Sequence, residues 1–509
     1  MGLFGNKADH PMADIKSAQQ LLKDVLRNDP LKALPEITDW IESVRDNADF
    51  HLDQRLDILN LLDEAARPLM RKLVREYFAV TTLSKFQENR TWMVLNEFFS
   101  QVEQAYFTVL NGYLKESKGS ASIKPSLPLI AARGIHGVMG RLKCAAARYE
   151  PVEPAIWQHL AEYFSHAEAH HYLSEPVKLY ASFAQHTSVR NKFVSVLMWY
   201  APGSTTLSPL HMHLAERLTA YFCKYFTMDG QITTNSLFYF DLQHIDLPQR
   251  VTAETRPMPG MRFLGAGDAK SHLEALLKVL EKHIVPDEIN LGGIYEADVV
   301  LDVARSLLNY WGAPAPMRRH ARRQIKVNVR VAYGYSRVVE CATDAGMADV
   351  DAPAWEVEDI SATGFRCVMP SKYTEGIKIG LIIGIRPENV AYWGVAIVRR
   401  LSRDQQGSLH VGVEVLANQM ASVGLSAHKS ATADNEHGAI WLKCLGDNTG
   451  GVSLLMRPGS YSSSRSLNTR FEGKDYLLIP LALQEKGMDY DLAKYRTVEQ
   501  ETNAVSDTY

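Results

Sequence analysis

A dense cluster of arginines, RRHARR, occupies residues 318–323. Four guanidinium groups within six residues cannot all be buried unless acidic partners or an anionic ligand neutralise them, and few acidic residues stand nearby in the sequence. A guanidinium is a planar fork that binds phosphate through two hydrogen bonds, stacks on aromatic rings and donates to the O6 and N7 atoms of guanine. The cluster therefore predicts a site for a guanine nucleotide.

A second motif, DISATG, follows at residues 359–364. Asp359 offers a carboxylate that can accept hydrogen bonds from guanine N–H groups, and Ser361 adds a short hydroxyl group. Gly364 permits either a close approach of another chain segment or a positive φ. We therefore expect the arginine cluster to supply positive charge and the second motif to recognise the base.

Short β-strands are predicted around both motifs. Runs such as QIKVNVRVAYG, AWEVEDI and LHVGVEVL are alternating or continuously apolar, and turn residues separate them. Successive strands at this spacing predict a β-barrel or sandwich over residues 318–418. After a polar stretch, similar runs predict a further β-rich region over 430–509, and the GAPAP segment predicts a linker at 312–317.

Residues 1–311 have the pattern of a large α-helical region, because apolar residues recur at helical spacing through most of it. Pro30, Pro35 and Pro68 fit helix starts or first turns better than helix interiors, since proline lacks the backbone donor. Short apolar runs between prolines predict a small β excursion near 235–267. The expected fold class is multidomain α + β, in which the helical region precedes an antiparallel β-barrel and a C-terminal β-rich region.

The overall composition excludes several classes of protein. The chain has 509 residues, too many for one compact core, and its 46% hydrophobic and 22% charged residues are typical of folded globular proteins. A net charge of −3 gives no global field that would hold nucleic acid. No apolar run approaches the length of about 18 residues typical of membrane spans, so we expect no membrane insertion. The five scattered cysteines and the absence of an apolar signal segment favour a cytoplasmic protein.

The order of these features resembles the PilZ domain, a bacterial cyclic di-GMP receptor. The resemblance covers residues 317–416 and consists of a spaced arginine pair, an alternating apolar strand, D-x-S-x-x-G and a closing GVEVL strand. In this family the arginines precede the barrel and hold the phosphates and one guanine, while the second motif receives the other guanine. The resemblance implies ligand contacts from Arg318, Arg319, Arg323, Asp359, Ser361 and Gly364. Arg318 with Arg322 forms an alternative register.

The PilZ resemblance also implies what kind of protein this is. We expect a noncovalent receptor for cyclic di-GMP that has no cofactor and is not an enzyme. Ordering of residues 318–323 around the ligand is expected to change how the barrel packs on the preceding helices, and the helical region is expected to bind a protein partner. The resemblance implies an outcome in motility, biofilm or exopolysaccharide control.

Two alternatives belong to other classes. His166 and His170 lie one helical turn apart in SHAEAHH, a spacing at which two imidazoles can share a metal, with Glu168 between them. They allow a metal-dependent enzyme in the helical region that the barrel regulates. The second alternative is a protein-interaction scaffold whose barrel is vestigial.

Overall fold

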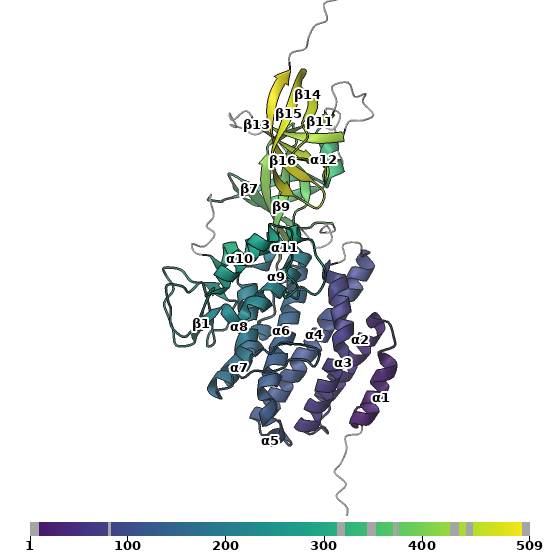
Figure 1. Ribbon diagram of the computed structural model, residues 1–509, viewed down its shortest axis with the longest axis vertical. Coiled ribbons are helices and arrows are strands. Elements are labelled where there is room, and N and C mark those ends of the chain that lie inside the picture. The colour runs from purple at the N-terminus through teal and green to yellow at the C-terminus, as the bar shows by residue number, and fades with distance from the viewer. Residues whose placement is uncertain are drawn as a thin grey trace, which may run out of the picture. The chain divides into compact units, whose positions relative to one another are not determined.

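The computed structural model describes residues 10–79, 83–312, 321–343, 353–369, 374, 376–427, 437–443 and 451–500. The chain divides into two compact units, residues 1–317 and 318–509. The first unit is mainly α-helical, and the second consists of β-strands and one short helix (Figure 1). This arrangement confirms the predicted fold class.

Eleven α-helices are described in the first unit, and many lie side by side as an antiparallel array (Figure 1). They are α1 (Ile15–Val25), α2 (Pro30–Asp46), α3 (Leu52–Ala79), α4 (Lys85–Leu114), α5 (Ser120–Ile123), α6 (Leu127–Ala147), α7 (Pro154–Ala169), α8 (Val189–Tyr200), α9 (Pro209–Phe222), α10 (Ala269–Leu280) and α11 (Ala297–Trp311). None of the helices in the described ranges is both long and apolar enough to cross a membrane.

Side-chain caps explain where several of these helices begin. Ser84 and Gln87 form a reciprocal capping box at the start of α4, and the hydroxyl of Ser208 accepts from the backbone of His211 at the start of α9. Pro30 occupies the first turn of α2, as predicted. Pro35 and Pro68 instead lie inside α2 and α3, so the prediction was wrong for both. The apolar faces of these helices are buried along their whole length, and this packing outweighs the hydrogen bond that each proline removes.

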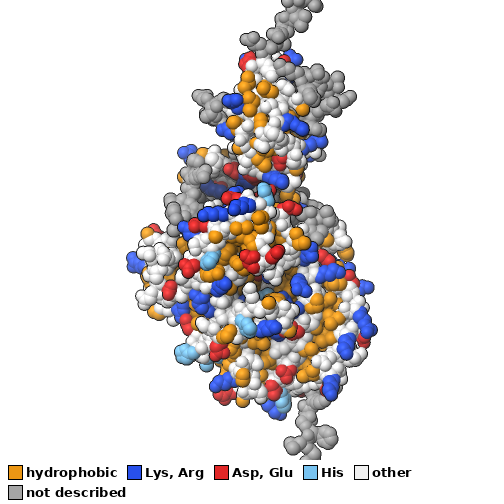
Figure 2. All heavy atoms as spheres, viewed as in Figure 1, with side chains coloured by type: hydrophobic (Ala, Val, Ile, Leu, Met, Phe, Trp, Pro, Cys, Tyr) orange, Lys and Arg blue, Asp and Glu red, His pale blue; other side chains and the backbone are white. Residues whose placement is uncertain are grey.

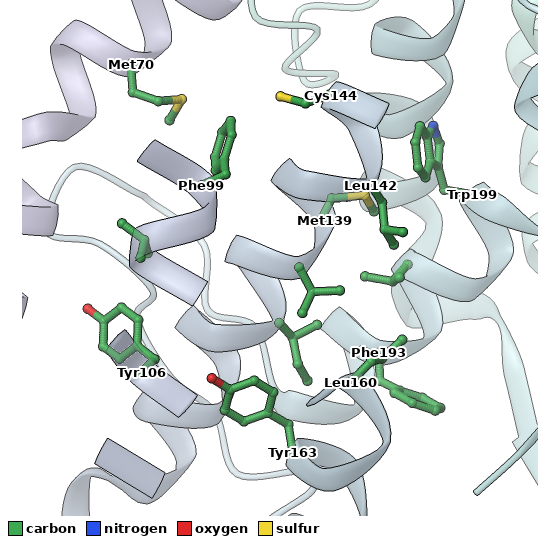
Figure 3. Close-up of a cluster of buried hydrophobic side chains, with 14 of the residues drawn as sticks. Met70, Phe99, Tyr106, Met139, Leu142, Cys144, Leu160, Tyr163, Phe193 and Trp199 are labelled. Atoms are coloured by element: carbon green, nitrogen blue, oxygen red, sulfur yellow. The ribbon is translucent and has the colours of Figure 1, made fainter. Parts of the chain in front are cut away.

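The core of the first unit surrounds α6. This helix buries residues on every side, as expected for a central helix, whereas α1 buries only one stripe. Figure 3 shows part of this core, where Leu142 of α6 lies among aromatic side chains of α4, α7 and α8. Tyr163 and Phe193 in this cluster are fully buried.

A small antiparallel sheet interrupts the helices between α9 and α10. Its strands are β1 (Thr227–Asp229), β2 (Phe238–Asp241), β3 (Gln249–Arg250) and β4 (Met261–Gly265), in the order β1-β4-β2-β3. Its inner residues, such as Phe240 and Leu264, join the helical core. Strands β2, β3 and β4 lie within the β excursion predicted near 235–267, whereas β1 precedes it.

The second unit begins with a closed six-stranded barrel. Its strands are β5 (Arg323–Tyr333), β6 (Ala354–Ser361), β7 (Gly364–Met369), β8 (Ile382–Pro387), β9 (Gly394–Arg403) and β10 (Leu409–Ala417), paired antiparallel in the order β10-β7-β6-β5-β8-β9. A short helix that the sequence analysis missed, α12 (Tyr335–Cys341), follows β5. Its seven residues are too few for a clear helical period, although Tyr335, Val338 and Cys341 form its buried stripe.

A six-stranded antiparallel sheet completes the second unit. Its strands are β11 (Gln419–Leu425), β12 (His437–Lys443), β13 (Gly451–Met456), β14 (Leu467–Phe471), β15 (Lys474–Lys486) and β16 (Asp491–Gln500), in the order β11-β12-β13-β16-β15-β14. A bridge between Ser426 and Asn468 brings the two edges together, so the sheet is nearly closed. The polar stretch that the sequence analysis places ahead of the C-terminal β-rich region therefore joins β11 to β12 within one sheet.

The barrel and this sheet share a hydrophobic core and a polar contact. Ile382 and Ile397 of the barrel pack in one buried cluster with Leu455 of the sheet. Arg399 of β9 donates two hydrogen bonds of 2.6 Å to Glu485 of β15, a bidentate pair with well-defined geometry. The two β modules therefore form one body.

Candidate functional site

Asp359 lies near the end of β6, beside the first residues of β5. Its side chain is 16% exposed, and Nη1 of Arg322 donates to its Oδ1 atom at 2.7 Å. Antiparallel pairing of Gln324 with Asp359 brings the end of the arginine cluster to this carboxylate. The structure thus joins the two predicted motifs at one rim of the barrel, where β6 ends and β5 begins.

A β-bulge between Val357 and Asp359 interrupts the regular pairing of β6 with β7 at the same rim. Such a bulge sets two residues of one strand against one residue of its partner, so both side chains can face the same neighbour. Arg366 of β7 is that neighbour, because its Nε lies 2.7 Å from Glu358 and 3.6 Å from Oδ2 of Asp359. The two oxygens of Asp359 therefore face two different guanidinium groups.

Arg366 and Glu358 are site residues that the sequence analysis missed. The signal was available in the second motif and the residues around it, because in a tight hairpin the strand residues on either side of the turn face each other. Ser361 pairs with Gly364, and Asp359 pairs with Arg366. Reading EDISATGFR as a hairpin would have placed this arginine opposite Asp359.

Ser361 stabilises the turn between β6 and β7. Its hydroxyl donates to the backbone carbonyl of Gly364 at 3.1 Å, across the two-residue connection. The backbone amide of Val415 donates to Thr363 in that connection at 3.0 Å, so β10 also holds the turn. Ser361 therefore positions the hairpin that carries Asp359.

Gly364 allows β10 to approach the hairpin closely. A Cβ atom at this position would lie 2.1 Å from the carbonyl oxygen of Val413, and no positive φ is recorded for the residue. Gly364 is therefore required for the close approach of β10 and not for a positive φ. A larger residue would push β7 away from β10.

We expect Gly364→Ala to destabilise the barrel by about 1–3 kcal/mol, because a backbone oxygen cannot move aside as a flexible side chain can. Gly384→Ala is a matched control in the same barrel, since its added Cβ meets its nearest neighbours at 3.5 Å, an ordinary contact. Hydrogen exchange of β7 and β10 peptides in the intact chain measures the effect. Equal exchange rates in the two variants would contradict this account.

Of the other predicted arginines, only Arg323 lies within the described residues. Arg323 is the first residue of β5, is exposed and pairs with Ile360. Arg318 and Arg319 lie outside the described residues. The structure therefore places Arg323 and Arg322 beside the second motif.

Both histidines of the predicted pair, and the glutamate between them, contact other groups of the helical region. The rings of His166 and His170 stack 4.1 Å apart, and Glu168 forms an ion pair with Arg262. His166 Nδ1 contacts the hydroxyl of Tyr172, and burial lowers the pKa of His166 to about 4. Within the described ranges, no group of three or more metal-binding side chains is found.

Comparison with known protein families gives two matches. Residues 16–231 match the model of the N-terminal domain of the cyclic-di-GMP receptor FimW, and residues 340–421 match the model of its middle PilZ domain. The second match confirms the PilZ resemblance and contains Asp359, Ser361 and Gly364, whereas it begins after the arginine cluster. No curated protein matches the chain.

Proposed function

Because the chain carries two domains of the cyclic-di-GMP receptor FimW family, we propose that it is a cyclic di-GMP receptor. The ligand is proposed to bind at the rim of the barrel around Asp359. The observation that supports this site is the convergence of Arg322 and Arg366 on the Asp359 carboxylate. Guanidinium groups that bind phosphate and guanine thus lie next to an acceptor for guanine N–H groups.

The proposed binding step exchanges one partner of Asp359 for another. Without ligand, Arg322 donates to Asp359 at 2.7 Å. A guanine whose N–H groups bond to this carboxylate releases the Arg322 guanidinium, which then binds a phosphate or stacks on the base. Arg318, Arg319 and Arg323 supply further contacts, as the family resemblance implies. Binding is noncovalent and needs no cofactor.

The ligand signal is proposed to reach the helical region through the arginine segment. This segment begins at residue 318, where the second unit starts in the chain. Ordering of residues 318–323 around cyclic di-GMP shifts the equilibrium between arrangements of the two units, provided that one arrangement binds the ligand more tightly. The helical region then acts on a protein partner in the bacterial cytoplasm, with motility or biofilm regulation as the output.

Calorimetric titration of cyclic di-GMP into the wild-type chain and Asp359→Ala tests the proposed site. We expect saturable binding in the wild type and at least about a tenfold weaker Kd in the variant, because a charge-assisted hydrogen bond is worth about 1.5–3 kcal/mol. Glu388→Ala removes an exposed carboxylate after β8 and is the matched control. No heat from the wild type would refute the receptor function, and unchanged affinity in Asp359→Ala would refute the site.

A further inference from the structure

Four basic side chains of the helical unit lie near His136, at some distance in sequence from any predicted site. They are Arg67 of α3, Lys143 of α6, Lys192 of α8 and Arg217 of α9, and each is buried or half-buried. We call them the basic cluster. On the face that Figure 2 shows, basic and acidic side chains are instead interspersed over the helices. Like charges that are withdrawn from water destabilise a protein unless anionic groups neutralise them.

Lys143 forms an ion pair with Glu216. Its Nζ atom donates to Nδ1 of His213 at 2.7 Å and to Glu216 at 3.2 Å. The opposite ring nitrogen of His213 lies 3.2 Å from the carbonyl oxygen of Leu291, which assigns the proton to Nε2. Burial, reinforced by Lys143, lowers the pKa of His213 to about 3, so this imidazole is neutral. Glu216 is therefore the partner of Lys143.

Arg67 is fixed in place by aromatic rings. Its guanidinium lies 4.0 Å from the ring centre of Tyr180 and 5.4 Å from that of Phe183. Nη1 approaches Nε2 of His136 at 3.2 Å, whereas Nε is buried and finds no hydrogen-bond partner among the described residues. The buried hydroxyl of Tyr295, whose ring lies 6.5 Å from that of His213, also lacks a partner in the described part of the chain.

The basic cluster lowers the pKa values of two neighbouring groups, Glu216 and His136. Burial alone would raise the pKa of Glu216, yet Lys143, Arg217 and Lys192 lower it to about 2. Burial also lowers the pKa of His136, and all four members of the basic cluster lower it further. Lys143, Arg217 and Lys192 thus act on Glu216, whereas Asp63 interacts with both Arg67 and Arg133, whose guanidinium lies 3.8 Å away.

We propose that the basic cluster binds a phosphate-bearing anion inside the helical unit. Two carboxylates, Glu216 and the Asp63 that also interacts with Arg133, do not balance the four cations of the cluster, whereas a phosphate group or a diphosphate carries two or more negative charges and several acceptor oxygens. Arg67, with its ring-supported guanidinium, supplies directed donors, and Lys192 supplies a compact charge. The ligand is a free phosphate compound or the phosphate part of a nucleotide, and it binds separately from the cyclic di-GMP site.

Titration of the full-length chain with inorganic pyrophosphate tests this proposal. Calorimetry is expected to show saturable binding with one site per chain, weakened at least tenfold in both Lys192→Gln and Arg67→Gln. Lys278→Gln, which neutralises an exposed lysine of α10, is the control and keeps wild-type affinity. Parallel titrations with inorganic phosphate, ATP and GTP identify whether the source is a free phosphate or a nucleotide, and sulfate at equal ionic strength measures general screening.

Thermal unfolding without added anion provides a second measurement. Burial lowers the pKa of Lys192, so its charged form destabilises the folded unit at neutral pH, below the pKa of an unfolded lysine. Lys192→Gln is therefore expected to unfold at a higher temperature than the wild type without pyrophosphate and to lose the stabilisation by pyrophosphate. Absence of saturable pyrophosphate binding in the wild type, or equal affinity in Lys192→Gln and Lys278→Gln, would overturn the proposal.

Discussion

Simultaneous replacement of Arg319 and Arg323 by alanine is expected to weaken cyclic di-GMP binding by more than about 100-fold. Each guanidinium is proposed to form charge-assisted hydrogen bonds with phosphate or guanine, and each such bond contributes about 1.5–3 kcal/mol. Loss of two therefore costs about 3 kcal/mol or more, and every 1.4 kcal/mol corresponds to about tenfold in Kd. Calorimetric titration of the intact chain measures the change.

The control for this variant removes two arginines elsewhere in the same unit. Arg337 of α12 and Arg465, in the connection between β13 and β14, are both exposed, so Arg337→Ala/Arg465→Ala changes the net charge equally. We expect the control to bind within about twofold of the wild type, since general electrostatic attraction is screened by salt. Similar losses in both double variants would show that net charge, rather than the arginine motif, determines affinity.

Arg133→Met is expected to destabilise the helical unit by about 3–5 kcal/mol, the usual cost of removing one partner of a buried ion pair. Arg133 is almost completely buried and donates to the carbonyl oxygen of Leu179 at 2.9 Å and to Tyr106 at 3.0 Å. Asp63, only 1% exposed, lies 3.8 Å away and would remain without its main cation. Hydrogen exchange of α3 and α6 peptides in the intact chain reports the loss.

The deficit of Arg133→Met should depend on pH. Burial raises the pKa of Asp63, and Arg133 opposes that rise, so the pKa rises further in the variant. A carboxyl group whose folded-state pKa is raised favours folding at low pH, and this contribution is lost as the pH rises through that pKa. The deficit is therefore expected to be larger at pH 8 than at pH 5. Asp63→Asn in the same chain should restore part of the stability, and no recovery would contradict the role assigned to the ion pair.

The sequence by itself determined the fold class and the presence of a PilZ domain. Apolar spacing distinguishes helix from strand when elements are long, as in α3 and α4, or repeated, as in β5 to β10. Local chemistry also sufficed to single out the second motif, because Asp359, Ser361 and Gly364 occupy one short hairpin. The same local reading failed for α12, which is too short to show a period, and for Pro68, where packing outweighs helix propensity.

Only the tertiary structure decided which side chains meet. The approach of Arg322 to Asp359 depends on the register between β5 and β6, and that of Arg366 depends on a bulge that moves Asp359 into reach. The basic cluster was invisible for the same reason, since its members come from four helices whose packing no local pattern specifies. Contacts between residues far apart in sequence depend on strand register and helix packing, which arise only when the whole core assembles.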